Sequence, residues 1–239
     1  ERKETSSEEL LRLYLTRIER LGSFHAVVTL DTDRALAEAR ACDAERARGE
    51  RRGPLHGLPV TVKDSFETAD LRTTSGGTPE LMAHVPARDA TVVARLKAAG
   101  AIVFGKTNLS TQAMDIQTYN AAFGTTPNPW DASRTAGGSS GGSAVAMSTG
   151  LSALEVGSDL GGSIRIPSAF CGVFGHRPSY GIVPTRGHIP GPPGTLAAPD
   201  LETAGPIARS ADDLDLALRL LAGPDEGHAV AWRLELPPP

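Results

Sequence analysis

Apolar residues at helical spacing open the chain. The apolar positions of this first stretch are Leu11, Tyr14 or Leu15, Ile18 and Leu21. Because they lie three or four residues apart, they predict an amphipathic helix of about four turns. Ser6 and Glu9 have the spacing of a capping box that would begin this helix, and Gly22 would end it.

Shorter apolar runs alternate with further helical patterns along the rest of the chain. The runs predict strands at residues 24–30, 60–63, 101–104, 152–156 and 181–184. Helices are predicted at residues 31–48, 89–99, 143–149 and 212–222, and another would begin at 108–113. Loops would cover residues 66–86, 163–178 and 187–199. This order predicts an α/β fold in which a mixed β-sheet is covered by α-helices on both sides.

The composition is that of a globular protein. The 239 residues are 40% hydrophobic and 22% charged, and we expect one domain over residues 1–239. The net charge of -4 and the dispersed basic residues argue against a general nucleic-acid binder. Cys42 and Cys171 are too few for a disulfide framework, and no apolar run is long enough to span a membrane. We therefore expect a reduced, cytoplasmic protein.

The stretch from Gly100 to Thr107 matches the P-loop pattern letter for letter. A phosphate-binding loop needs a strand before its first glycine and a bent loop in its four middle positions. Here the four middle residues are themselves the best predicted strand of the region, and a predicted helix precedes Gly100. We therefore reject a nucleotide site.

The stretch from Gly137 to Gly141 fits the nucleophile-elbow pattern of α/β-hydrolases. That elbow must follow a strand directly, whereas residues 127–136 contain two prolines and no apolar alternation. The general base would have to be His176, His188 or His228. An α/β-hydrolase-type esterase therefore stays open as a weaker alternative.

A lysine and two Gly/Ser-rich segments offer a different chemistry. Lys63 ends the predicted strand that begins at Val60, and a lone lysine in such a position is more often a surface residue. If it were buried among neutral hydroxyls, its pKa would fall, and the neutral amine could accept a proton in place of a histidine. The six histidines show no close pair with metal-ligand spacing, so we expect no metal and no cofactor.

Three glycine-containing runs carry a specific resemblance. They are Gly57 to Asp64, Gly137 to Ser143 and Gly157 to Gly172. Together with Lys106-Thr107-Asn108, Asn128 to Asp131 and Gly205 to Ser210, they resemble the amidase signature family. Fatty acid amide hydrolase and the A subunit of glutamyl-tRNA amidotransferase belong to that family. The resemblance covers the chain from the first predicted helix to about residue 223 and implies the amidase-signature fold.

The resemblance implies a Ser-cisSer-Lys triad formed by Ser163, Ser139 and Lys63. Ser163 would attack the amide carbonyl and form an acyl-enzyme. Ser139 would pass the proton to neutral Lys63 and return it to the leaving amine. The peptide bond between Gly138 and Ser139 would be cis. The oxyanion hole would be formed by the backbone N–H groups of Leu160, Gly161, Gly162 and Ser163.

Other residues would support the triad. Ser140 would hydrogen-bond within the network. Asp159 and Arg165 flank Ser163, and an ion pair that braces the loop is a better interpretation of these two residues than direct chemistry. By analogy, Met114 would line the acyl pocket, although a methionine in the core is an equally good interpretation. Family members carry a further C-terminal half, so we expect this chain to be the N-terminal part of a longer amidase fold.

The leading functional hypothesis is hydrolysis of a linear carbon–nitrogen bond in a small-molecule amide, without metal, cofactor, nucleic acid or membrane. A second hypothesis is the A-type glutaminase subunit of a tRNA-dependent amidotransferase, which would work with partner subunits. A third is a non-catalytic amidase-like binding module. A homodimer is left open.

Overall fold

The computed structural model describes residues 5–189 and 200–237. Its α-helices are α1 (Ser7–Arg20), α2 (Thr32–Ala47), α3 (Thr91–Ala98), α4 (Gly141–Ser148), α5 (Arg165–Cys171) and α6 (Ala211–Leu221). Its strands are β1 (Val27–Leu30), β2 (Pro59–Lys63), β3 (Ile102–Thr107), β4 (Tyr119–Asn120), β5 (Gly124–Thr125), β6 (Glu155–Asp159), β7 (Phe174–Gly175) and β8 (Thr203–Ala208). Short 3-10 turns occupy Gly22–Phe24, Pro79–Leu81 and Thr111–Ala113.

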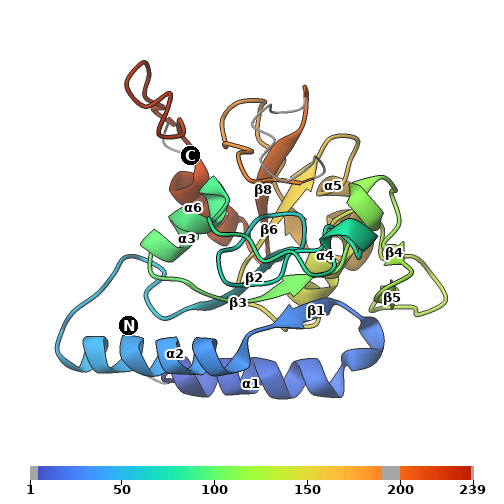
Figure 1. The fold of residues 1–239 in the computed structure, drawn as a ribbon, viewed down its shortest axis with the longest axis horizontal. Helices are drawn as coiled ribbons and strands as arrows, with labels where there is room; N and C mark the ends of the chain where they lie inside the picture. Colours follow the sequence, from blue (N-terminus) through green and yellow to red (C-terminus); the bar gives the residue numbers. More distant parts are fainter. Residues whose placement is uncertain (1–4, 190–199, 238–239) are drawn as a thin grey trace.

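Strands β1 to β3 and β6 to β8 form a mixed arrangement at the centre of the molecule, whereas β4 and β5 form a separate antiparallel pair at its edge (Figure 1). In the first sheet β3 lies between β1, which is antiparallel to it, and β2, which is parallel. In the second sheet β8 lies between β6 and β7, and both pairs are antiparallel. β2 lies against β6, and the backbone N–H of Thr61 donates to the hydroxyl of Ser152 (2.9 Å) where the two sheets meet.

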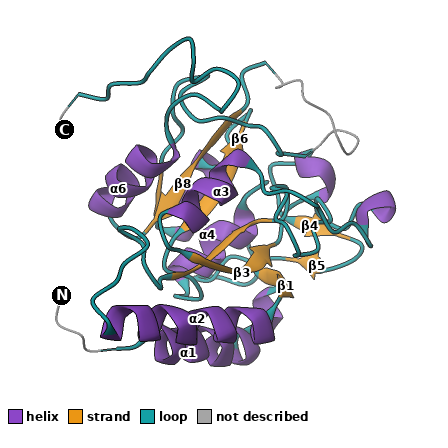
Figure 2. Ribbon diagram, turned by 60° about the vertical axis from the view of Figure 1, so that its left-hand side comes forward, coloured by secondary structure: helices purple, strands orange, loops and turns teal. Residues whose placement is uncertain are grey.

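Helices cover both faces of these strands, as the sequence predicts. Alternate residues of a strand point to opposite faces, and β3 divides its side chains in this way. Ile102 and Phe104 pack with α1 and α2, where the ring of Tyr14 stacks on Phe104 with centroids 6.2 Å apart. Val103 instead packs on the other face with residues of α3 and α6, such as Leu96 and Leu221. Figure 2 shows the α1–α2 pair and the α3–α6 pair on opposite sides of β3.

Serine side chains cap the N-termini of α1 and α6. The Ser6 hydroxyl accepts from the Glu9 N–H (3.0 Å), and the Glu9 carboxylate accepts from the Ser6 N–H (2.8 Å), so the predicted capping box is confirmed. α6 begins in a similar way, because the Ser210 hydroxyl accepts from the N–H of Asp213 (3.1 Å).

The predicted loop over residues 163–178 is wrong, because it contains α5 and β7. Pro167 lies in the first turn of α5, where a missing N–H costs no hydrogen bond. Gly172 ends the helix with a φ of 69°, a left-handed conformation that glycine adopts without strain.

Three further predictions differ from the structure. The strand predicted at 181–184 is absent: Ile182 instead accepts a hydrogen bond from the N–H of Gly223 (2.9 Å), and Val183 is buried against the helical layer. The strand predicted at 152–156 begins at Glu155 and continues to Asp159. The helix predicted from 108–113 is only a 3-10 turn at Thr111–Ala113. Part of the loop predicted at 187–199 lies outside the described residues.

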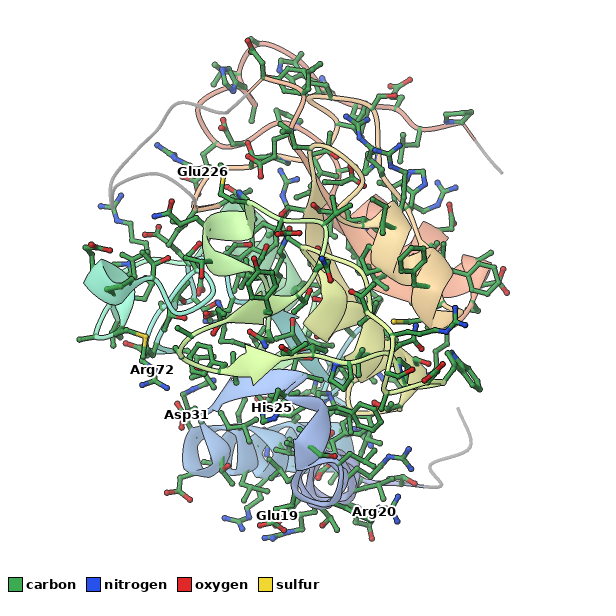
Figure 3. All side chains as sticks on the ribbon, turned by 90° about the vertical axis from the view of Figure 1, so that its right-hand side faces the viewer. Glu19, Arg20, His25, Asp31, Arg72 and Glu226 are labelled. Atoms are coloured by element: carbon green, nitrogen blue, oxygen red, sulfur yellow. The ribbon has the colours of Figure 1, made fainter. Side chains whose placement is uncertain are left out.

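Charged side chains are spread over the surface. Figure 3 shows Glu19, Arg20, Asp31 and Arg72 at separate places on the outside of the molecule, with Glu226 at the opposite end from Glu19. No helix within the described ranges is both long and apolar enough to cross a membrane. Both cysteines are free and buried.

Candidate active site

Lys63 ends β2 with its side chain completely buried. Its Nζ lies 2.7 Å from Oγ of Ser139 and 2.9 Å from Oγ of Ser158. Burial lowers the pKa of Lys63 from its usual 10.5 to about 7, although the negative charges of Glu202 and Asp159 act in the opposite direction. A large share of the Lys63 amine is therefore neutral near pH 7, within hydrogen-bond distance of a hydroxyl whose proton it can take.

The segment before α4 holds Ser139 in place. The peptide bond between Gly138 and Ser139 is cis, as the resemblance implies. A Cβ at Gly138 would lie 2.6 Å from the backbone of Gln117, so only glycine fits there. The hydroxyl of Thr118 donates to the carbonyl of Gly137 (2.9 Å) and accepts from the N–H of Gly141 (3.0 Å). Ser139 is therefore a completely buried residue on a closely packed backbone.

Ser163 lies beside this segment. The N–H of Ser140 donates to the carbonyl of Ser163 (3.1 Å), which ties the two segments together. The hydroxyl of Ser140 donates to the carbonyl of Ser158 (3.3 Å), so Ser140 hydrogen-bonds to both neighbouring segments. Ser163 is half-buried, and within residues 5–189 and 200–237 no side chain hydrogen-bonds its hydroxyl. That hydroxyl is therefore available to a bound molecule.

The Asp159 carboxylate organises the loop that carries Ser163. It accepts from the backbone N–H groups of Gly162 (2.8 Å) and Ile164 (3.0 Å) and from the guanidinium of Arg165 (2.9 and 3.0 Å). The guanidinium of Arg177 lies 3.6 Å away. Burial alone would raise the pKa of Asp159, but these donors lower it to about 2. Asp159 and Arg165 therefore form the expected ion pair.

The four backbone N–H groups assigned to the oxyanion hole do not have equal surroundings. The N–H of Gly162 already donates to Asp159. Those of Leu160, Gly161 and Ser163 have no hydrogen-bond partner in the described part of the chain. Gly162 has a φ of 121°, and a Cβ there would lie 2.6 Å from the side chain of Ile166, so the turn requires glycine. The Leu160 side chain is exposed at the edge of this loop.

Met114 is 81% exposed and follows the 3-10 turn Thr111–Ala113. No contact in the described residues places it against the triad. Its assignment to an acyl pocket stays a prediction from the resemblance.

Several buried polar residues near the site escaped the sequence analysis. Ser158 belongs to one of the two Gly/Ser-rich segments and was given no role, yet it lies on β6 and contacts Lys63. Glu155 on the same strand accepts from the hydroxyls of Thr61 and Thr107, and burial raises its pKa to about 7. A charged residue between Leu154 and Val156 was the available signal, because a charge in an apolar run needs partners.

Lys106 is a second buried lysine, and it supports the loop that follows Lys63. Its Nζ donates to the carbonyl of Phe66 and to the hydroxyls of Thr68 (2.9 Å) and Thr73 (3.1 Å). Burial lowers the pKa of Lys106 to about 8, although Asp64 acts in the opposite direction. These bonds hold the backbone downstream of β2 and reach neither serine of the triad.

The rejected and weaker motifs can be judged from the same geometry. Residues Ile102–Thr107 form a strand, so the P-loop pattern lacks the bent loop that it needs. No strand leads directly into Gly137, as a nucleophile elbow would require. Among the residues that the structure describes, no histidine hydrogen-bonds Ser139 or Ser163, which disfavours the α/β-hydrolase alternative.

The structure brings three metal-ligand types of residue close together, namely Cys42, Glu45 and His56. Their spacing in the sequence did not indicate a metal site. One ligand-type atom from each lies within 4.8 Å of the others. However, Nδ1 of His56 accepts from the N–H of Arg52 (3.1 Å), and Nε2 lies 2.9 Å from the carbonyl of Cys42. The guanidinium of Arg52 also donates twice to Glu45 (2.7 and 2.8 Å). These atoms are thus engaged in joining α2 to the turn that follows it.

Known proteins resemble this chain over nearly its whole length. Residues 9–233 match the model of the Amidase family. Over 227 residues the chain is 48% identical to the A subunit of glutamyl-tRNA(Gln) amidotransferase from Anaeromyxobacter sp. (strain K), covering 93% of this chain and 44% of that protein. The same subunit from Cupriavidus necator is 47% identical, with 92% of this chain and 42% of that protein covered. The chain spans about half the length of these curated relatives.

Solved structures of amidases have the same fold. The peptide amidase of Stenotrophomonas maltophilia superposes with a TM-score of 0.88 at 38% identity, covering 98% of this chain and 48% of that one. A bacterial aryl acylamidase of the amidase signature family gives a TM-score of 0.87 at 31% identity, also over 98% and 48% of the two chains. The expected amidase-signature fold is confirmed, and this chain again corresponds to about half of each structure.

Proposed function

The chain belongs to the Amidase family, and from this premise we propose that it hydrolyses a linear amide through an acyl-enzyme on Ser163. The observation that carries the proposal is the 2.7 Å approach of the buried Lys63 amine to the Ser139 hydroxyl. An amine with a pKa near 7 is a suitable general base at neutral pH.

The proposed reaction has two steps. Oγ of Ser163 attacks the carbonyl carbon, its proton passes to Ser139, and Ser139 gives its own proton to Lys63. The carbon–nitrogen bond then breaks as the proton returns through Ser139 to the leaving nitrogen, which leaves an ester on Ser163 and a free amine. Water hydrolyses this ester by the same relay in reverse order, and the products are a carboxylic acid and the original Ser163 hydroxyl.

Backbone donors would stabilise the negative oxygen that forms in each step. The N–H groups of Leu160, Gly161 and Ser163 are the donors of this loop without a partner in the described residues, and loss of one such donor typically costs about 3 to 4 kcal/mol of transition-state stabilisation. The N–H of Gly162 would take part only if it left Asp159. We propose that its bond to Asp159 keeps the other three donors oriented.

The reaction should depend on pH through Lys63. Only the neutral amine can accept the proton of Ser139, so kcat/KM should fall as pH drops through about 7 and reach a plateau above it. The measurement is the pH profile of hydrolysis, with circular dichroism at each pH to show that the protein stays folded. A value of kcat/KM that does not change between about pH 5 and pH 9 would argue against a lysine base.

A fluorophosphonate probe tests the nucleophile directly. Such probes phosphonylate an activated serine, and we expect the modification to map to Ser163 by peptide mass spectrometry. Modification of Ser139 would instead support the nucleophile-elbow interpretation. No serine modification would contradict the proposed mechanism for this chain.

A second candidate function is favoured by the curated relatives, which carry the name of the glutamyl-tRNA(Gln) amidotransferase A subunit. In this case the amide would be the side chain of glutamine, the product would be ammonia, and the chain would work with partner subunits. Comparing ammonia release from glutamine with hydrolysis of simple aliphatic and aryl amides separates the two. Strict dependence on glutamine would overturn the general amidase.

A further inference from the structure

A histidine and a glutamate that the proposed mechanism does not use are buried next to the segment that carries Lys63. The stretch around His188 is fastened to the backbone immediately after Lys63: Ile189 N–H donates to the carbonyl of Ser65 (2.7 Å). Glu67 N–H in turn donates to the carbonyl of residue 187 (2.8 Å). The ring of His188 lies 4.8 Å from that of Phe66, and its side chain is only 1% exposed.

Glu202 reaches the same place from the other sheet. It immediately precedes β8, and Thr203 pairs with Asp159 across the antiparallel β6–β8 ladder. Glu202 therefore lies opposite Leu160, at the edge of the loop that carries Ser163. Ala204, two residues further along, pairs with Ser158, so the alternation of side chains along the ladder places Glu202 on the face where Ser158 contacts Lys63 Nζ (2.9 Å). Glu202 is 7% exposed, and its carboxylate Oε1 lies 3.0 Å from Nδ1 of His188.

Two negative charges act on Lys63, those of Asp159 and Glu202, and they differ in how far neighbouring positive groups neutralise them. Asp159 is paired with the guanidinium of Arg165 (2.9 Å) and lies 3.6 Å from that of Arg177, so its field on Lys63 is largely compensated. Glu202 lies against His188, whose two ring nitrogens have no hydrogen-bond partner among the described residues. Of the remaining buried charges near β2, Lys106 interacts with both Asp64 and Glu155.

The His188 ring leaves the charge of Glu202 uncompensated. Burial lowers the pKa of His188 below its usual 6.5, although Glu202 acts in the opposite direction. His188 is therefore neutral at pH 7. Burial raises the pKa of Glu202, but the adjacent His188 and the positive charge of Lys63 lower it below 4.5 overall, so Glu202 is ionised at the same pH. The pair thus keeps one net negative charge close to an amine that must become positively charged when it takes a proton.

We propose that Glu202, which lies against His188, is a positioning residue whose carboxylate stabilises the protonated form of Lys63 during the serine-to-lysine proton transfer. This role rests on the proposed function of the triad. Without the carboxylate, desolvation of Lys63 would go unopposed by its largest favourable charge. The amine would still sit beside Ser139, but it would be a weaker base.

Direct titration of Lys63 tests the role without relying on hydrolysis. The chain has few lysines, Lys3, Lys63, Lys97 and Lys106, so the 13Cε signals of labelled lysine can be assigned with single Lys→Met variants. In Glu202→Gln we expect Lys63 to titrate lower by about one pH unit, the size typical of a nearby buried charge. In Glu202→Asp, which keeps the charge, most of the wild-type titration should remain.

The same Glu202 variants should also change how the reactivity of Ser163 depends on pH. The acidic limb of fluorophosphonate labelling of Ser163 should move to lower pH in Glu202→Gln, and the plateau rate should fall several-fold because the base is weaker. The matched control is Glu67→Gln, since the Glu67 carboxylate lies 3.4 Å from His84 and is also partly buried. That variant should leave both profiles unchanged.

Two results would overturn the role of Glu202. One is an unchanged Lys63 titration in a folded Glu202→Gln protein. The other needs no variant of Glu202: if 13C signals of the wild type show His188 still protonated at pH 8, Glu202 is neutralised and the proposal fails. Absence of Ser163 labelling in the wild type would instead count against the proposed function and would leave the titration result standing.

Discussion

Replacing Ser163 with alanine is expected to lower the rate of amide hydrolysis by about 10^4-fold or more, because loss of the nucleophile removes the acyl-enzyme route altogether. The hydroxyl has no side-chain partner in the described residues, so the free energy of unfolding should change by no more than about 0.5 kcal/mol. Rate assays, urea unfolding and fluorophosphonate labelling measure the three quantities.

Ser168→Ala is the matched control for this variant. Ser168 lies on α5, five residues further along, and its buried hydroxyl also has no partner among the described residues. We expect this variant to hydrolyse amides and take up the probe like the wild type. Hydrolysis at the wild-type rate in Ser163→Ala would refute the assignment of the nucleophile.

Lys63→Met is expected to lower the hydrolysis rate by about 10^3- to 10^4-fold, nearly as much as loss of the nucleophile, because members of a triad act as a unit. Methionine keeps the length and apolar body of the side chain but cannot take a proton from Ser139. His176→Ala should have little effect, because no hydrogen bond of the described residues links His176 to either serine. A small effect of Lys63→Met together with a large effect of His176→Ala would restore the α/β-hydrolase alternative.

Lys63→Met should also change how stability depends on pH. The pKa of Lys63 is about 7 in the folded chain against an ordinary 10.5, so between these values the unfolded chain binds more protons. Lys63 therefore makes the wild type less stable as pH falls from about 10.5 towards 7. Urea unfolding across this range should show the variant gaining stability relative to the wild type as pH falls. A difference independent of pH would mean that Lys63 is not desolvated.

Local sequence signals predicted the elements whose residues interact with their own neighbours. The capping box at Ser6 was readable because its two residues lie three positions apart, and the strand around Val103 was readable because its residues form a continuous apolar run. The resemblance to a family, rather than any periodicity, supplied the triad of Lys63, Ser139 and Ser163. Their side chains come from three separate segments, and nothing in the local spacing brings these together.

The elements that the sequence analysis missed depend on distant partners. β8 contains Gly205 and Pro206, which normally argue against a strand. It forms because β6 and β7 lie on either side of it. A Cβ at Gly205 would lie 2.2 Å from the carbonyl of His176, so the glycine permits a close approach that no local pattern reveals. Ser158 and Glu202 were missed for the same reason, since their partners are about 95 and 14 residues away, respectively.

The complete burial of Lys63 separates its basicity from its reactivity towards electrophiles. A neutral amine can itself capture an acyl group, and the amide so formed would inactivate the protein permanently. In this structure the amine is 0% exposed and hydrogen-bonded to Ser139 and Ser158, whereas Ser163 is half-buried. A covalent inhibitor should therefore be designed for the serine, since an amine-directed reagent would meet the partly exposed Lys97 first and leave the buried lysine untouched.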